Sequence, residues 1–340
     1  MTDRVLLTGI SGFLGGHLAL QLLNAGYIVR GSVRNLSRAD KVRATLSKAG
    51  AEVDRLEFVA LDLESDVGWQ DAMDGVRYLQ HTASPFVLQM PDDKDDLIRP
   101  AVQGTERALN AALAAKVERI VLTSSMAAIA YGHDRTRSAP FTANDWTNLE
   151  GRGVNPYTES KTRAERRAWE IMREAGREKD MAAINPSGIF GPLLDEDPGT
   201  SVTLVQRLLN GSVPAAPRIP LAVVDVRDVA EAHLAAMVSN EAGGHRFPMA
   251  HSTMYFKDVA EILREAFPAY AKKIPKLELP DWVVRVYALF DKDVRSNLGE
   301  LGVLKRLDAS AAMRLLDRKL TPADASFVAT GESLIREGLI

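Results

Sequence analysis

The chain has 340 residues, of which 26% are charged, and a formal net charge of −3. This balance provides no basic surface for nucleic acid or an anionic membrane. The length exceeds the usual size of one hydrophobic core, so we expect either one large domain with a smaller lobe or two domains. The sequence contains no cysteine, which excludes disulfides, thiolate catalysis and cysteine-ligated metals.

Short apolar strands alternate with amphipathic helices through most of the chain. This pattern predicts an α/β fold with a Rossmann-type doubly wound parallel sheet. The N-terminus lacks a signal-peptide pattern and no apolar run reaches the roughly 18 residues of a membrane span, so we expect a cytoplasmic protein. The predicted strands are Arg4–Thr8, Ile28–Val33, Leu56–Leu61, Tyr78–Thr82, Arg119–Ser124, Met181–Asn185, Ala222–Val226 and Arg246–Met249. The predicted helices between them are Phe13–Asn24, Arg38–Lys48, Leu97–Ala115, Pro156–Ala175 and Asp228–Val238.

The second half of the chain has loops rich in Pro and Gly and a helical tail. Tail helices are predicted at Phe256–Phe267, Asp281–Phe290 and Pro322–Glu337. We therefore expect a Rossmann domain of residues 1–190 and 222–250, with a smaller, mainly helical substrate lobe of residues 191–221 and 251–340. The acidic cluster Asp92–Asp96 is interpreted as a solvated loop.

A glycine-rich turn follows the first strand and opens the first helix, as Thr8-Gly9-Ile10-Ser11-Gly12-Phe13-Leu14-Gly15. In this context, the glycines allow a tight turn, close approach of a pyrophosphate and close packing of helix on strand. The N–H groups and the dipole of the helix start favour the anion. The predicted nucleotide contacts are Gly9, Ser11, Gly12, Phe13, Leu14 and Gly15.

The end of the second strand bears on the choice of nucleotide. NAD-binding versions usually place Asp or Glu there, but Arg30–Asn35 contains no carboxylate. Arg34 has the geometry to form a fork onto a 2′-phosphate, and Lys41 adds a second charge, so NADP(H) is predicted. Asp62, followed by Leu63, ends the third strand, where it serves either the adenine amino group or a local turn.

Tyr157 and Lys161 lie four residues apart on a predicted helix and therefore share one face. A phenol is a poor acid at neutral pH, but a neighbouring ammonium lowers its pKa and makes it a proton donor to a carbonyl oxygen. Ser125 follows the strand Arg119–Ser124, whose end lies where ligands bind in doubly wound folds. Its hydroxyl is a candidate to hold the substrate oxygen, and Ser124 is the rival for that role.

With these motifs the chain resembles the extended short-chain dehydrogenase/reductases, in particular the dihydroflavonol 4-reductase and cinnamoyl-CoA reductase branch with its microbial aldehyde and ketone reductases. The resemblance covers about residues 4–250 in the family's order. It is carried by the glycine turn, Val33-Arg34, His81-Thr82-Ala83-Ser84-Pro85, Thr123-Ser124-Ser125, Tyr157 with Lys161, Asn185-Pro186-Ser187 through Gly191-Pro192, and Val224-Asp225-Val226-Arg227-Asp228-Val229.

The resemblance implies that Tyr157 is the general acid of carbonyl reduction and that Lys161 binds the nicotinamide ribose and tunes Tyr157. It implies that Ser125 holds the substrate oxygen. It also implies nicotinamide-side contacts from Thr82, Ala83, Ser84, Thr123, Pro186, Ser187 and Ile189, and a phosphate contact from Ser201.

The plant dihydroflavonol enzymes carry Asn where this chain has Ala130, five residues after Ser125, so a flavonoid substrate is not expected. An apolar, partly aromatic substrate pocket is predicted instead, with His133 as a further candidate. The six histidines show no metal-ligand spacing, and no metal site is predicted. The residues predicted to line the pocket are Phe86, Met126, Tyr131 and Phe190.

The function predicted from these residues is NADPH-dependent reduction of a small aldehyde or ketone by a monomer or homodimer. An NAD-dependent sugar-nucleotide epimerase or dehydratase is one alternative, and Arg34 with Ala83-Ser84-Pro85 argues against it. A non-catalytic NADP-sensing protein is the other, and the retention of Tyr157 and Lys161 argues against that.

Overall fold

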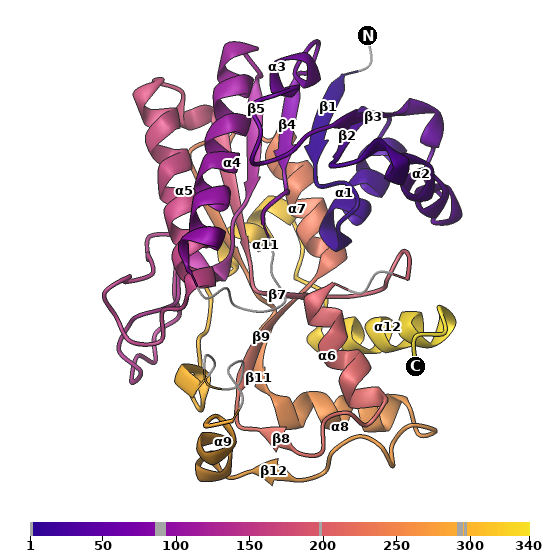
Figure 1. Cartoon of the computed structure of the whole chain (residues 1–340), viewed down its shortest axis with the longest axis vertical. Helices are drawn as coiled ribbons and strands as arrows, with labels where there is room; N and C mark the ends of the chain where they lie inside the picture. The colour runs from indigo at the N-terminus through magenta and orange to yellow at the C-terminus, as the bar shows by residue number, and fades with distance from the viewer. Residues whose placement is uncertain (1–2, 86–92, 197–198, 291–294, 296–297) are drawn as a thin grey trace.

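The structure is a computed structural model that describes residues 3–85, 93–196, 199–290, 295 and 298–340. Within these ranges, a seven-stranded sheet occupies the upper half of Figure 1, in the order β10-β6-β5-β4-β1-β2-β3. Neighbouring strands are parallel, and the register sets Val5 opposite both Val29 and Tyr78. The predicted doubly wound sheet is therefore confirmed. The strands are β1 (Arg4–Thr8), β2 (Ile28–Val33), β3 (Leu56–Ala60), β4 (Tyr78–His81), β5 (Arg119–Thr123), β6 (Met181–Pro186) and β10 (Arg246–Met249).

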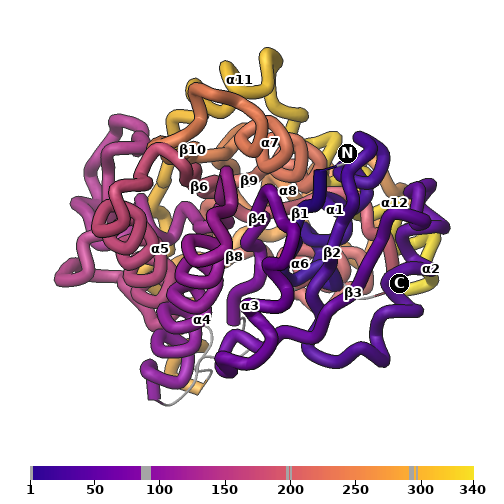
Figure 2. The backbone as a smooth tube through the Cα atoms, turned by 90° about the horizontal axis from the view of Figure 1, so that it is seen from above, coloured from indigo at the N-terminus to yellow at the C-terminus, as the bar shows by residue number. Residues whose placement is uncertain are grey.

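Helices cover both faces of this sheet, which explains why all six residues of β6 are buried. Seen from above, α4 and α5 lie on one side of the strands, and α7 and α11 lie on the other (Figure 2). None of the helices in the described ranges combines the length and hydropathy that a membrane crossing requires. The helices of this domain are α1 (Phe13–Asn24), α2 (Ala39–Lys48), α3 (Trp69–Ala72), α4 (Asp95–Ala114), α5 (Pro156–Glu174), α7 (Val226–Val238) and α11 (Ser310–Leu316), with 3-10 turns at Leu36–Arg38, Val53–Arg55, Met126–Ala128 and Glu178–Asp180.

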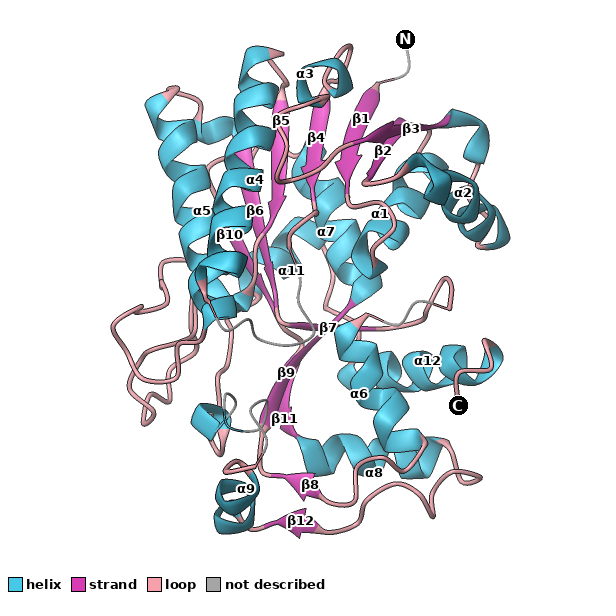
Figure 3. Ribbon diagram, viewed as in Figure 1, coloured by secondary structure: helices cyan, strands magenta, loops and turns pink. Residues whose placement is uncertain are grey.

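A smaller lobe lies below the sheet, as Figure 3 shows. Its core joins Phe190, Val223, Leu263 and Phe327, which are all buried. In its three-stranded sheet, β9 pairs parallel with β7 and antiparallel with β11. The lobe contains β7 (Gly188–Phe190), β8 (Ala216–Pro217), β9 (Pro220–Asp225), β11 (Ser252–Tyr255), β12 (Glu278–Leu279), α6 (Thr200–Leu209), α8 (Phe256–Ala266), α9 (Asp281–Tyr287), a 3-10 turn at Leu298–Glu300 and α12 (Ala323–Arg336).

The predicted strands and helices of the first 190 residues are confirmed, but the predicted domain boundaries need correction. The strand predicted at Ala222–Val226 is β9, and it belongs to the sheet of the lobe because its neighbours are β7 and β11. Conversely, Ala312 and Leu316 of α11 pack into the core of the larger domain, although they lie within the predicted lobe. Both errors concern which other strands and helices an element packs against, and hydrophobic periodicity along the chain does not determine that.

The acidic cluster Asp92–Asp96 was expected to be a loop, and this is wrong for its second half. Asp95 and Asp96 form the first turn of α4, where the helix dipole stabilises negative side chains. Asp92 lies outside the described residues.

The close packing of α1 on β1 gives a test of the glycine turn. A Cβ built on Gly15 would lie 2.1 Å from the Gly9 carbonyl oxygen, so we expect Gly15→Ala to lower the free energy of unfolding by roughly 1–3 kcal/mol. Gly16→Ala is the matched control on the same helix, because its nearest neighbour is the flexible Leu194 Cδ1 at 3.3 Å. Urea denaturation checks both variants, and equal stability of the two would contradict the packing argument.

Candidate active site

The glycine turn between β1 and α1 forms the floor of a nucleotide-sized cleft. Gly9 has a φ of 72°, which favours glycine, and the Gly12 N–H donates to the Gly9 carbonyl at 3.0 Å. Gly12 is the N-cap of α1 and provides no side-chain cap. The first N–H groups of the helix are therefore left for another acceptor, which suits a pyrophosphate.

The cleft has a volume of about 350 Å³ and opens over the carboxyl ends of β1, β2 and β4. Next to it, a smaller pocket of about 160 Å³ lies between the turn, α2 and the loop Leu193–Asp195. The residues lining the larger cleft are Thr8, Gly9, Ser11, Gly12, Ser32, Val33, Arg34, Arg38, Leu61, Leu63, Trp69, Thr82, Ala83 and Ser84.

Three basic residues lie along this cleft and the adjoining pocket. The predicted Arg34 lines the cleft, and Lys41 lines the adjoining pocket. Arg38 lines both cavities and was missed by the sequence analysis. Arg38 could have been predicted from its position between the basic residues Arg34 and Lys41, at the start of the helix after β2. Asp62 Oδ1 accepts a hydrogen bond from Glu64 N at 3.0 Å, which is a local turn contact, and the contact with the adenine amino group stays a prediction.

The structure brings Ser125, Tyr157 and Lys161 together where β5 ends and α5 begins. Asn155 caps α5 through a reciprocal pair of 2.9 Å hydrogen bonds with Thr158, so Tyr157 lies in the first turn. The Ser125 hydroxyl hydrogen-bonds the Tyr157 side chain. The Lys161 ammonium lies 6.0 Å from the centre of the Tyr157 ring. These three residues share the edge of the sheet at which the nucleotide cleft opens.

Burial dominates the protonation of this cluster. It raises the pKa of Tyr157, contrary to the lowering predicted from the sequence, because burial outweighs the opposing hydrogen bond from Ser125. It lowers the pKa of Lys161 to about 8, and the Glu165 carboxylate, one helical turn further along α5, opposes that shift. At neutral pH the cluster therefore combines a protonated phenol with a charged ammonium, which is the state required to protonate a carbonyl oxygen.

The two serines at the end of β5 have different partners. Ser124 Oγ donates to the buried Glu165 Oε2 at 2.5 Å and is committed to that carboxylate. Ser125 Oγ accepts from Ala127 N at 3.1 Å and reaches Tyr157. This geometry favours Ser125 over Ser124 as the residue that meets a substrate.

The nicotinamide-side residues predicted from the sequence lie on β4, β5 and β6 and the segments after them. Thr8 Oγ1 accepts from the N–H groups of Thr82 and Ala83, both at 3.1 Å, and so fixes that segment at the cleft. Thr123 is instead bonded to the buried His233, at 2.9 Å between Oγ1 and Nε2. After β6, the hydroxyl of Ser187 is buried and has no hydrogen-bond partner in the described chain. Such a group requires a partner, and a carboxamide would provide one.

The predicted substrate pocket is only partly supported by the structure. Phe190 was misassigned, because its ring lies 4.6 Å from Phe327 in the core of the lobe. Met126 and Tyr131 pack in a small apolar cluster, and the Lys305 ammonium lies 4.3 Å above the Tyr131 ring. Lys305 was not predicted, because it comes from the tail that the sequence resemblance does not cover. Phe86 lies outside the described residues.

The histidines have structural partners where the structure describes their contacts. His81 Nδ1 bonds Thr8 Oγ1 at 2.9 Å, and burial lowers its pKa to about 4. His133 Nε2 bonds the Ile129 carbonyl at 3.1 Å and packs 4.9 Å from the Phe141 ring. In the described ranges, no group of three or more His, Asp and Glu side chains has the arrangement of a metal site.

The sequence of this chain is similar to those of known reductases. Residues 5–250 match the NAD dependent epimerase/dehydratase family. The chain belongs to this family. It is 34% identical to cinnamoyl-CoA reductase CAD2 of Medicago truncatula, over 82% of each chain, and 32% identical to tetraketide alpha-pyrone reductase 2 of Arabidopsis thaliana, over 79% of this chain and 84% of that one. It is thus an oxidoreductase of the extended short-chain type, as the sequence resemblance indicated.

Solved structures extend this likeness to the tail of the chain. Yeast methylglyoxal/isovaleraldehyde reductase Gre2, crystallised with NADPH, is 29% identical with a TM-score of 0.80, covering 99% of this chain and 100% of that one. Vestitone reductase from alfalfa is 21% identical with a TM-score of 0.76, covering 100% of both chains, and shows the shared fold. The helical tail is therefore part of the family architecture.

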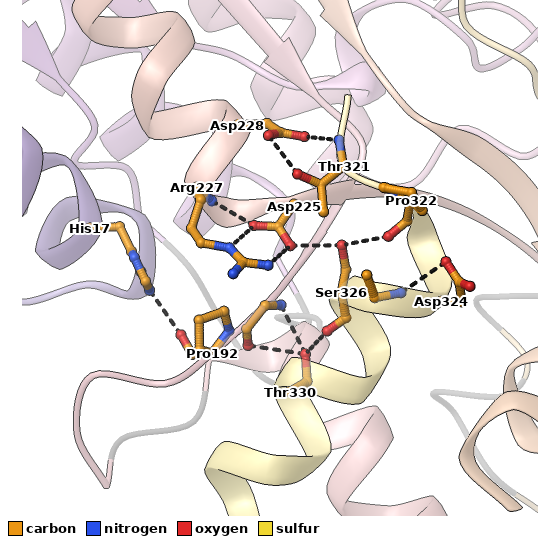
Figure 4. Close-up of polar contacts among 12 residues, drawn as sticks. His17, Pro192, Asp225, Arg227, Asp228, Thr321, Pro322, Asp324, Ser326 and Thr330 are labelled. Carbon is orange, nitrogen blue, oxygen red and sulfur yellow. Dashed lines mark hydrogen bonds and ion pairs between the residues drawn. The ribbon is translucent and has the colours of Figure 1, made fainter. Parts of the chain in front are cut away.

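In this oxidoreductase, a buried polar network ties the C-terminal helix to the loop beside the glycine turn (Figure 4). Asp225 is fully buried at the end of β9, where Arg227 binds it through Nε and Nη2, both at 2.8 Å, and Ser326 Oγ donates to it at 2.7 Å. One turn along α12, Thr330 Oγ1 accepts from Gly191 N at 2.8 Å and bonds the Gly191 carbonyl at 3.0 Å. The network thus fixes the start of the loop that begins at Gly191.

Two further contacts hold the same loop. Ser333 Oγ accepts from Leu193 N at 2.9 Å. His17 Nε2 of α1 bonds the Pro192 carbonyl at 2.8 Å, as Figure 4 shows. Because Leu193 and the residues after it line the pocket beside the glycine turn, α12 positions one wall of the nucleotide site.

Thr330 gives a direct test of this network. Thr330→Val keeps the shape of the side chain but leaves the buried Gly191 N–H unpaired, so we expect a loss of roughly 1–3 kcal/mol in the free energy of unfolding. Thr105→Val is the matched control, because the buried Thr105 hydroxyl bonds only the carbonyl of Ala101 in its own helix. The same small loss in both variants on chemical denaturation would contradict the role given to the Thr330–Gly191 contact.

Proposed function

We propose that this protein reduces a small aldehyde or ketone to the alcohol with NADPH, and that Tyr157 donates the proton. The observation that carries the proposal is the cluster of Ser125, Tyr157 and Lys161 at the edge of the sheet where the nucleotide cleft opens. A proton donor, a cation and a hydroxyl at a dinucleotide site suit carbonyl reduction.

The residues present fit a nicotinamide nucleotide at both ends of the cleft. The uncapped start of α1 suits the pyrophosphate, and the unpartnered hydroxyl of Ser187 suits the carboxamide. Arg34 and Arg38 line the adenosine end, and the Arg30–Asn35 stretch has no carboxylate for a free ribose hydroxyl. Guanidinium groups bind phosphate oxygens in a fork, which favours NADP(H) over NAD.

The chain's own residues divide the reaction between them. When bound, NADPH supplies the hydride that the carbonyl carbon accepts. Ser125 donates a hydrogen bond that orients the substrate oxygen, and Tyr157 gives its phenolic proton to that oxygen. The Lys161 ammonium stabilises the phenolate that Tyr157 becomes, and it is placed to bind the nicotinamide ribose.

Small substrates are favoured by what surrounds the cluster. Met126, Ala130 and Tyr131, which follow Ser125 in the chain, pack in a compact apolar cluster, and the Lys305 ammonium lies over the Tyr131 ring. Yeast Gre2, which shares the fold over nearly the whole chain, is by its name a reductase of methylglyoxal and isovaleraldehyde, both small aldehydes.

Replacing the proton donor tests the reaction. We expect Tyr157→Phe to lower kcat/KM for aldehyde and ketone reduction by roughly 10²–10⁴-fold, because the general acid is lost, with little change in the Kd of NADPH. Tyr27→Phe, at a distant, partly buried tyrosine that packs on Tyr78, is the control and should keep full activity. Steady-state assays that follow NADPH loss measure both variants. A fully active Tyr157→Phe enzyme would rule out the assigned proton donor.

The basic residues test the nucleotide. We expect Arg34→Ala and Arg38→Ala each to raise the Kd of NADPH by about 10–100-fold, since each removes a charge-assisted contact with the 2′-phosphate. The Kd of NADH, which lacks that phosphate, should stay nearly unchanged. Lys48→Ala, at the far and exposed end of α2, should affect neither nucleotide. Isothermal titration or fluorescence measures the affinities, and equal loss for both nucleotides would contradict NADP specificity.

A further inference from the structure

Directly behind the catalytic cluster lies a fully buried carboxylate. Glu165 is 1% exposed, and it follows Lys161 by one turn of α5. Its Oε1 accepts from Arg246 Nε at 2.6 Å and from Trp169 Nε1 at 3.2 Å. Its Oε2 accepts from Ser124 Oγ at 2.5 Å, from Asn185 Nδ2 at 2.7 Å and from Arg246 Nη2 at 3.1 Å. Strands β5, β6 and β10 therefore all meet at one side chain of the catalytic helix.

The partner of Glu165 is equally enclosed. Arg246, on β10, is 8% exposed, and its guanidinium lies 3.8 Å above the Trp146 ring. Nη1 donates to the carbonyl oxygens of Ala143 at 2.8 Å and Asp145 at 2.6 Å. The ion pair thus also anchors the loop after β5, which carries Met126 and Tyr131 of the predicted substrate pocket.

Two of the residues that donate hydrogen bonds to Glu165 are also connected to Ser125. Ser124 is its neighbour in the chain, and Asn185 Nδ2 also donates to the Ser125 carbonyl at 3.3 Å. The same carboxylate raises the pKa of Lys161 against the effect of burial. One charged side chain is therefore connected to Ser125 through hydrogen bonds and to Lys161 through its field.

The stability of the folded protein does not by itself explain the buried ion pair of Glu165 and Arg246. A buried ion pair loses so much hydration that well-packed apolar residues of similar volume are often as stable or more so. On this side of the sheet, Trp169 and Met172 of the same helix pack in an apolar core. An ionised pair at this point is thus better explained by what it does for the residues beside it.

We propose that Glu165, held by Arg246, is a positioning residue of the active site: its carboxylate fixes the Ser125 end of β5 against α5 and supplies the negative charge behind the Lys161 ammonium. This inference rests on the proposed carbonyl reduction for its kinetic test, while the charge on Lys161 is measurable without turnover.

The other ionisable groups near Lys161 do not supply a negative charge beside its ammonium. His81, on β4, has its pKa lowered to about 4 by burial and by Lys161 itself, so it is neutral in the working range. Burial keeps Tyr157 protonated there. Arg246 faces the carboxylate from β10. Within the described residues, Glu165 is the group whose charge raises the pKa of Lys161.

The test is the pH profile of kcat/KM for carbonyl reduction. Lys161 is active as the ammonium, so wild-type activity should fall as the pH rises through about 8. Glu165→Gln keeps the shape of the side chain and removes its charge, and we expect the alkaline limb to move to lower pH by about one unit. Glu165→Asp keeps the charge but shortens the side chain, so the limb should stay near the wild-type position while kcat falls.

A second readout needs no catalysis. Competitive labelling of the protein with acetic anhydride across pH, followed by peptide mass spectrometry, reports the pKa of Lys161 itself. We expect the same downward shift in Glu165→Gln and none in Glu165→Asp. Should Glu165→Gln fail to fold, Glu165→Gln combined with Arg246→Met leaves no unpaired buried charge and should give the same direction of shift.

The outcomes separate the two claims. Lower thermal stability of Glu165→Gln with an unmoved alkaline limb and an unmoved Lys161 pKa would make Glu165 a merely structural residue and overturn the inference. Absence of carbonyl reduction in the wild type would instead overturn the proposed function, and the labelling result would still decide whether Glu165 acts on Lys161.

Discussion

A lysine must remain charged in a place where burial opposes its charge. The ammonium of Lys161 is useful only while protonated, yet enclosure at the end of β5 brings its pKa down to about 8. Exposing Lys161 would restore the charge but would weaken its effect on Tyr157, because water screens the interaction. The surrounding fold resolves this conflict: the carboxyl edge of the parallel sheet encloses the site, and α5 places a buried carboxylate one turn from the ammonium.

The same edge explains how distant parts of the chain reach one site. Parallel strands place their carboxyl ends along one edge of the sheet, and each of the main site residues follows such an end. The glycine turn follows β1, Arg34 follows β2, Thr82 follows β4, Ser125 follows β5 and Ser187 follows β6. The lobe contributes walls rather than reacting groups. Its C-terminal helix holds the loop beside the nucleotide through Ser326, Thr330 and Ser333, and Lys305 lies behind Tyr131.

Local patterns in the sequence were enough for the individual strands and helices, the glycine turn and the Tyr157–Lys161 face, because each depends on neighbours within a few residues. They were not enough where a partner lies far along the chain. Glu165 and Arg246 are 81 residues apart, and the residues around each of them do not indicate an ion pair. Phe190 was misassigned for the same reason, since its position after β6 does not reveal that Phe327 covers it.

The proposed reaction moves a hydride from C4 of NADPH to a carbonyl carbon. The most direct measurement uses NADPH deuterated on each face of C4 in turn, with a panel of small aldehydes and ketones, and analyses the alcohol by mass spectrometry. Hydride transfer by this chain should place one deuterium on the carbinol carbon from one of the two labelled nucleotides. Nucleotide binding with no labelled alcohol from any member of the panel would contradict it and would favour an epimerase or a nucleotide sensor.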